Sequence, residues 1–446
     1  MKMRRSFDNR VSAQGPESMW AIVDMACYCG CHAQPGPSDR LTPVESGTDM
    51  ELDFEKSAVL LLLIAAVVAI LTRRLHLPYS VGLVAAGMGV ALLPFAPKLS
   101  LTRELIFTGL LPPLIFEAAF YLRWRDLRRD MPVISALATI GVLLSASVTT
   151  VGMHFLAHWE WASALVFGVL IAATDPVSVI ATFREANVHG RLRLLIEAES
   201  LFNDGTAAVG FGIAVVLASG HTLPGLTMLR TALVTTGGGI LCGAVVGNLV
   251  LYLAGRTKDH LVETTCTTIA AYGSFLLADT LHVSGVFATL TAGLVLGNLG
   301  PLGPISDRGR EAVQAFWEYA AFVANSIVFL LIGMQETSRH FGAAWFSALI
   351  AVFLVTLGRA VAVYPVCRLF SRSSLRISRK HQHVLFWGGL RGALALALVL
   401  SLPAEVPRRE EITTASFAVV AFSIFVHGLT IAPVLRAVGE IPPRKG

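Results

Sequence analysis

Thirteen long apolar segments fill almost the whole chain after residue 56, and they constrain its fold more than any other feature. Each contains roughly 16–29 residues, whereas a helix of about 20 apolar residues spans the hydrocarbon core of a bilayer. Hydrophobic residues make up 54% of the chain and charged residues 15%, which excludes an ordinary soluble domain. The sequence therefore predicts an all-α integral membrane protein with about 13 transmembrane helices, at residues 57–72, 78–93, 104–122, 131–156, 161–183, 194–219, 226–254, 261–278, 283–299, 315–334, 342–370, 384–402 and 412–438.

The distribution of Lys and Arg predicts the orientation of these segments. Of the 35 basic residues, 21 lie at the C-terminus or in the loops that follow odd-numbered segments, and only 6 lie in the alternate loops. Because basic residues concentrate in cytoplasmic loops, we expect a cytoplasmic C-terminus and an N-terminus outside. The net charge of +5 then reflects membrane orientation and does not indicate a nucleic-acid partner. We expect a multi-pass protein of the cell inner (plasma) membrane.

Residues 1–49 do not fit this pattern, and we expect a disordered or spurious N-terminal extension. Met50 is a sensible start just before the first apolar segment. The run Cys27-Tyr28-Cys29-Gly30-Cys31-His32 leaves a metal site as an alternative. Zinc ligands, however, normally come as Cys pairs two to four residues apart, with a second pair further on.

The sixth segment contains two acids at a depth where ionisable side chains are costly. In the string Glu199-Ser200-Leu201-Phe202-Asn203-Asp204, Glu199 and Asn203 are four residues apart, as are Ser200 and Asp204. On a helix both pairs fall in one narrow polar sector. An ionisable residue within the membrane usually marks an ion or proton pathway, so this sector is a candidate site. Glu197 falls on another side and has no assigned role.

The fifth and twelfth segments contain helix-breaking strings. Asp175 precedes Pro176, which removes a backbone N–H and disfavours helix at the residue before it. The twelfth segment contains Gly388-Gly389-Leu390-Arg391-Gly392. If the seventh segment links two inverted six-helix repeats, these interrupted crossing helices occupy the same position in each repeat. Such a pair is the best sequence indication of a transporter site.

Three more ionisable residues lie inside apolar segments: Glu117, Arg359 and Arg391. The two arginines need counter-charges, and the acids of the third, fifth and sixth segments are the candidates. These residues could all be neutralised pairs that hold helices together. Buried acids outnumber buried arginines, however, and Asp204 is the acid least readily explained as a structural partner.

Together these strings resemble the monovalent cation/proton antiporter family, and more narrowly its electroneutral sodium/proton exchanger (NhaP/NHE-like) branch. The resemblance rests on Thr174-Asp175-Pro176, on the Glu199–Asp204 string and on the Gly388–Gly392 string. Phe322-x-x-Asn325-Ser326 and the stretch 112–120 also resemble that branch. The likeness covers essentially all of residues 55–438.

This resemblance implies a scaffold of helices 1–3 and 8–10 that forms a homodimer, and a mobile core of helices 4–6 and 11–13. It implies that Asp204 binds a monovalent cation and a proton alternately, together with Asp175. Asn203 stands where the electrogenic branch has a second aspartate, which implies one cation exchanged per proton. Glu199 matches the acid that pairs with Arg359 or, alternatively, with Arg391. The remaining positions expected around the ion are Thr174, Ser200 and Glu117.

The resemblance implies a secondary antiporter and not an enzyme, with no cofactor, whose partners are Na⁺ (or Li⁺ or K⁺), H⁺ and the lipid bilayer. A K⁺-selective efflux pathway or channel on the same fold is the alternative. A transporter of organic anions would need basic residues free in the site, and Arg359 and Arg391 keep that third class open.

Overall fold

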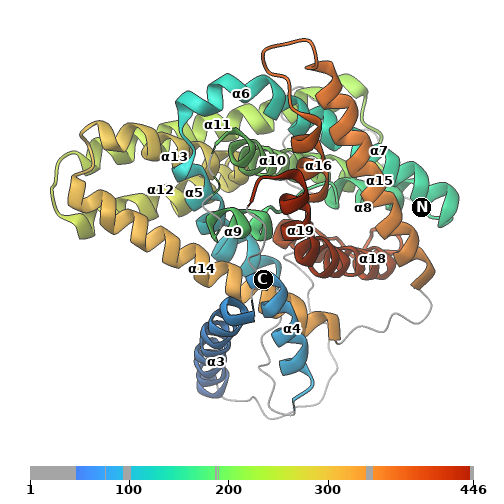
Figure 1. Cartoon of the computed structure of the whole chain (residues 1–446), viewed down its shortest axis with the longest axis horizontal. Coiled ribbons are helices and arrows are strands. Elements are labelled where there is room, and N and C mark those ends of the chain that lie inside the picture. The colour runs from blue at the N-terminus through green and yellow to red at the C-terminus, as the bar shows by residue number, and fades with distance from the viewer. Residues whose placement is uncertain are drawn as a thin grey trace, which may run out of the picture.

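The computed structural model describes residues 47–75, 77–93, 102–185, 188, 190–337 and 345–441, which are helical almost throughout (Figure 1). In this part of the chain, eight helices are long and apolar enough to cross a membrane, and four shorter apolar helices accompany them. The prediction of an all-α integral membrane protein is therefore confirmed. The number of membrane crossings stays a prediction.

The helices follow the predicted apolar segments in order. The first half of the chain forms α3 (Gly47–Leu75), α4 (Tyr79–Ala91), η1 (Leu105–Leu110), α5 (Leu111–Tyr121), α6 (Trp124–Ala136), η2 (Leu137–Gly141), α7 (Val142–Leu156), α8 (Trp161–Leu170), α9 (Val177–Glu185) and α10 (Arg191–Ala218). The rest forms α11 (Gly225–Ala254), α12 (His260–Thr280), α13 (Gly285–Leu299), η3 (Gly300–Leu302), α14 (Asp307–Thr337), α15 (Trp345–Leu369), α16 (Arg379–Trp387), α17 (Ala393–Leu400), α18 (Arg409–Phe422), η4 (Ser423–His427) and α19 (Gly428–Val438).

Both predicted helix interruptions are present. The fifth segment breaks between α8, which ends at Leu170, and α9, which begins at Val177. The twelfth breaks between α16, which ends at Trp387, and α17, which begins at Ala393. The first break contains Asp175-Pro176, where proline supplies no N–H for a continuous helix. Each break leaves two half-helices whose ends lie inside the protein.

Several helices begin earlier than the apolar pattern predicts. α6 begins at Trp124 instead of residue 131, α14 at Asp307 instead of 315, and α3 at Gly47 instead of 57. The added turns of α6 are rich in charged residues. A helix can continue past the apolar core of the bilayer into a polar layer, so the apolar pattern gives the membrane-spanning part of the helix and not its full length. An N-terminal extension was predicted for residues 1–49. Residues 1–46 of this extension lie outside the part of the chain that the structure describes.

The helices pack as two neighbouring groups with α10 near the centre (Figure 1). In one group α14 packs along α4, α13 packs along α5, and α11 and α12 pack against α13. In the other, α7 packs against α15 and α8, and α10 packs against α8 and α6. α4 and α14 approach so closely that a Cβ atom at Gly87 would fall on the carbonyl oxygen of Leu330. Small residues at such crossings allow tight backbone contact between membrane helices.

Candidate ion-binding site

The two helix interruptions cross each other and pair through their backbones. The N–H of Asp175 donates to the carbonyl oxygen of Leu390 at 2.8 Å, which forms an isolated antiparallel bridge. Irregular backbone at membrane depth is tolerated only where it is buried in protein or lines a cavity. This crossing therefore places residues of the fifth and twelfth segments side by side, although they are more than 200 positions apart.

An acidic side chain, Asp175, lies at the N-termini of half-helices, and a basic side chain, Arg391, lies at the C-terminus of one. The carboxylate of Asp175 accepts the N–H of Val177 at 3.0 Å and also interacts with the N–H of Ala393. It therefore lies at the N-termini of both α9 and α17, where the helix dipole favours negative charge. Arg391 Nη1 donates to the carbonyl oxygen of Gly389 at 2.9 Å, just past the C-terminus of α16, where positive charge is favoured.

Thr174 is held against α10 by three hydrogen bonds. Its backbone N–H donates to Asn203 Oδ1 at 3.1 Å, and its Oγ1 accepts from Asn203 Nδ2 at 2.6 Å. Its carbonyl oxygen accepts the hydroxyl of Ser200. Asn203 Nδ2 also donates to Glu199 Oε1 at 3.0 Å, and its side chain is fully buried. The amide of Asn203 thus fixes the unwound segment to α10 and does not point into open space.

Glu199 is neutralised by Arg359 of α15. Arg359 Nη1 donates to Glu199 Oε1 at 2.7 Å and Nη2 donates to Oε2 at 3.0 Å, so the pair is bidentate. Nη2 also donates to the carbonyl oxygen of Leu385 at 2.9 Å. Glu199 is 2% exposed and Arg359 is 7% exposed. Between the two arginines that the sequence allowed, the geometry selects Arg359.

Arg391 does not share this ion pair, which differs from the sequence expectation. No carboxylate of the described residues lies within ion-pair distance of its guanidinium, although the side chain is only 2% exposed. The arginine instead donates to the carbonyl oxygen of Gly389, because the backbone of the interruption turns it toward the C-terminus of α16. Neither Arg359 nor Arg391 lines the main cavity, so these two arginines do not provide an organic-anion site there.

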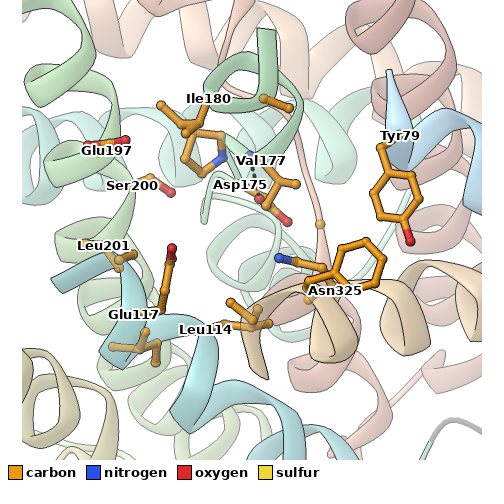
Figure 2. A pocket seen from close by; sticks show the side chains of 18 of the residues that line it. Tyr79, Leu114, Glu117, Asp175, Val177, Ile180, Glu197, Ser200, Leu201 and Asn325 are labelled. Carbon is orange, nitrogen blue, oxygen red and sulfur yellow. Dashed lines mark hydrogen bonds between the residues drawn. The ribbon is translucent and has the colours of Figure 1, made fainter. Parts of the chain in front are cut away.

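A cavity of about 400 Å³ lies in front of the crossing, between the two helix groups. Figure 2 shows Glu117 of α5 and Ser200 of α10 directed into the space before Asp175, with Tyr79 and Asn325 on the other side. The structure brings five of the six predicted ion-site residues to this cavity. They are Glu117, Thr174, Asp175, Ser200 and Asp204, whereas Asn203 lies behind them.

Asp204 differs from the other acids of α10 in its surroundings. It is partly buried and lines the cavity, and no hydrogen bond from the described residues ends on its carboxylate. Glu199, one helical turn away, has its charge balanced by Arg359. Asp204 therefore presents to the cavity a carboxylate that is not bound by another described side chain.

The polar cavity residues that were absent from the predicted site include Tyr79, Glu197, Glu318 and Asn325. Glu318 and Asn325 are seven residues apart on α14, so they share one helix face, and that spacing could have identified them. Glu197 also lines the cavity and pairs with Arg193 at 2.9 Å in the first turns of α10. The hydroxyl groups of Tyr79 and Ser326 form a hydrogen bond of 2.8 Å. Nothing in the sequence around Tyr79 indicated this contact.

The cavity suits a weakly held hard cation. Its polar groups offer carboxylate, hydroxyl and carbonyl oxygens, which are the ligands that hard cations prefer. Among the described residues, no three His, Cys, Asp or Glu side chains gather as they would around a tightly bound metal.

Interrupted helices that cross beside a carboxylate-lined cavity are typical of secondary transporters. The sequence matches the family described as "Sodium/hydrogen exchanger, transmembrane" over residues 60–437. The chain belongs to this family.

Individual relatives and a solved structure agree with that assignment. The chain is 40% identical to the Na(+)/H(+) antiporter ApNhaP of Aphanothece halophytica, over 83% of this chain and 71% of the relative. It is 31% identical to the Na(+)/H(+) antiporter NhaH of Halobacillus aidingensis, over 85% of this chain and 97% of the relative. Its fold resembles that of the sodium proton antiporter MjNhaP1 from Methanocaldococcus jannaschii, with a TM-score of 0.68 at 20% identity, over 88% of this chain and all of that one.

Proposed function

We propose that this protein exchanges Na⁺ for H⁺ across a membrane, one for one, by competition of the two ions for Asp204. It is a transporter and not an enzyme. Na⁺/H⁺ exchange is supported by family membership and by relatives that carry that name at 31–40% identity. No observation on the described residues favours the alternative of a K⁺-selective efflux pathway or channel.

One observation carries the assignment to Asp204. Its carboxylate lines the cavity without a hydrogen bond from the described residues, while Glu199 on the same helix is already paired with Arg359. A carboxylate without a fixed partner binds whichever cation is available. Deprotonated Asp204 binds Na⁺, protonated Asp204 does not, and the loaded site moves only when its charge is neutralised. Because both ions use one carboxylate, their fluxes are coupled without simultaneous binding.

The charge balance of α10 supports exchange of one cation per proton. Asn203 carries no charge and its amide is engaged by Thr174 and Glu199. Glu199 is neutralised by Arg359. Asp175 is held at the N-termini of two half-helices, and we propose that its protonation state stays constant throughout the cycle. Asp204 is then the acid that changes partner, and the cycle moves no net charge.

The packing supports a division into a moving and a fixed part. Asp204 and the crossing belong to the group α6–α10 and α15–α19, which we propose as the mobile core. The helices α3–α5 and α12–α14 supply the opposite wall of the cavity and are the proposed scaffold and dimer surface. Among the residues that line the cavity, Arg73 and Glu197 lie near helix ends that the distribution of Lys and Arg predicts to be cytoplasmic. The cavity therefore opens to the cytoplasm of a protein in the cell inner (plasma) membrane, with a cytoplasmic C-terminus.

Transport by purified protein in liposomes tests this function. Vesicles with an acidic interior and a pH-sensitive dye should lose their gradient when NaCl is added, and Asp204→Asn should abolish the response while the protein still folds. Asp279→Asn provides a matched control, because Asp279 is exposed on α12. Comparison of Na⁺, Li⁺ and K⁺ salts ranks the cations. Full exchange by Asp204→Asn would contradict the proposal, and cation flux without proton flux would indicate a channel.

A further inference from the structure

A second, small polar cavity lies inside the proposed core. It is enclosed by α15, α18, η4 and the interruption between α16 and α17, and it shares no lining residue with the larger cavity. Its volume of about 10 Å³ is close to that of one water-sized sphere. The polar residues that line it are Thr356, Arg359, Arg391, Ser423 and His427.

Several nitrogen atoms around this cavity have no hydrogen-bond partner. Within the described part of the chain, Arg359 Nε, Arg391 Nε and both ring nitrogens of His427 are buried without one. The three residues are 7%, 2% and 8% exposed, respectively. Buried polar groups in folded proteins are nearly always paired, with protein, water or a bound ion. Four such atoms at one cavity indicate that it binds a ligand.

The hydrogen-bonding groups are mostly donors. An arginine Nε–H only donates, and a neutral histidine supplies one donor and one acceptor. Ser423 Oγ already accepts the backbone N–H of Arg391 at 2.8 Å, which leaves its hydroxyl proton to donate. A ligand that only accepts hydrogen bonds fits this lining better than one that must also donate.

The charge around the cavity is positive. Arg359 is balanced by Glu199, but Arg391 has no carboxylate of the described residues within ion-pair distance. Carbonyl oxygens at the end of α16 accept from both arginines, at Leu385 and Gly389, and offset part of this charge. A buried charge without a full partner is unfavourable, so an anion at this position would stabilise the crossing of the two interruptions.

We propose that this cavity binds one small monovalent inorganic anion of the size of chloride, held by Arg391, His427 and Ser423. The cavity volume admits a single atom and excludes sulfate, phosphate and organic anions. The anion is structural, because the cavity is separate from the one that contains Asp204. A bound water molecule is the competing occupant and is an outcome of the test.

Thermal unfolding of the purified, detergent-solubilised protein tests the proposal. Chloride is exchanged for gluconate at constant Na⁺, pH and ionic strength. The unfolding temperature should rise saturably with chloride, by about 2 °C or more at high occupancy, because a ligand that binds only the folded state stabilises it. Arg391→Gln should remove the dependence on chloride. Arg368→Gln should keep it, because Arg368 is exposed on α15. Equal unfolding temperatures in chloride and gluconate would overturn the proposal.

A second measurement uses the wild-type protein and therefore does not require that any variant folds. Crystals of the wild-type protein grown in bromide should show an anomalous scattering peak beside Arg391 Nε and His427. Electron density for a water molecule there, without an anomalous peak, would overturn the proposal. Both experiments are independent of transport, so loss of Na⁺/H⁺ exchange and loss of anion binding can be distinguished.

Discussion

Replacing Arg359 with alanine should destabilise the protein more than any other removal of a single ion pair. The substitution deletes three hydrogen bonds, two to Glu199 and one to the carbonyl oxygen of Leu385. Glu199, whose side chain is 3% exposed in the intact protein, would then keep only Asn203 as a hydrogen-bond donor. Loss of one partner from a buried pair costs about 3–5 kcal/mol, because the remaining charge stays uncompensated.

The matched control is an ion pair on α10, the helix of Glu199, and its acid Glu197 is two residues from Glu199. Arg193 pairs with Glu197 at 2.9 Å, but both side chains are about one-fifth exposed. Arg193→Ala should therefore cost only about 0.2–1 kcal/mol, as for other solvent-accessible pairs.

Unfolding temperature in detergent, followed by tryptophan fluorescence, measures the difference. The double variant Arg359→Ala, Glu199→Gln should recover part of the loss, because it removes the uncompensated charge. Equal effects of Arg359→Ala and Arg193→Ala, or no recovery in the double variant, would refute the reasoning.

Three further predictions concern transport. Exchange in liposomes at equal pH on both sides should be insensitive to a potential set with valinomycin, whereas an electrogenic cycle would be biased by about 2.3 kcal/mol per charge at 100 mV. Gly392→Ala should slow exchange by about tenfold or more, because its Cβ would fall on Asp175 Oδ2 and displace that carboxylate. The control Gly212→Ala should exchange normally, because its Cβ would meet no neighbouring atom. Glu117→Gln should raise the Na⁺ concentration for half-maximal exchange by about fivefold, equivalent to about 1 kcal/mol, and an unchanged value would remove Glu117 from the site.

Local backbone chemistry and helical spacing made much of this architecture predictable. Proline after Asp175 and the glycines around Arg391 predicted both interruptions, since these residues disfavour continuous helix. The four-residue spacing of Ser200 and Asp204 correctly placed both on the cavity side of α10. Such features depend on neighbours within one or two helical turns, which the sequence contains.

Tertiary contacts were less predictable. The same four-residue spacing links Glu199 and Asn203, but it does not say that Asn203 turns to Thr174 instead of the cavity. That choice depends on the position of the unwound segment, which is fixed by its bridge to Leu390 across more than 200 residues. Arg391 turned away from the acids for the same reason, because the path of the interruption directs it to the end of α16.

Proton release on cation binding tests the role of Asp204 most directly. NaCl is added to purified protein in weak buffer, and the pH change is compared with the amount of Na⁺ bound. If both ions compete for one carboxylate, the wild-type protein should release about one proton per Na⁺ bound, because binding of either ion must weaken binding of the other. Asp204→Asn should release none, and Asp279→Asn should behave as the wild type. Undiminished proton release by folded Asp204→Asn would contradict the account and assign the exchange to another acid of the cavity.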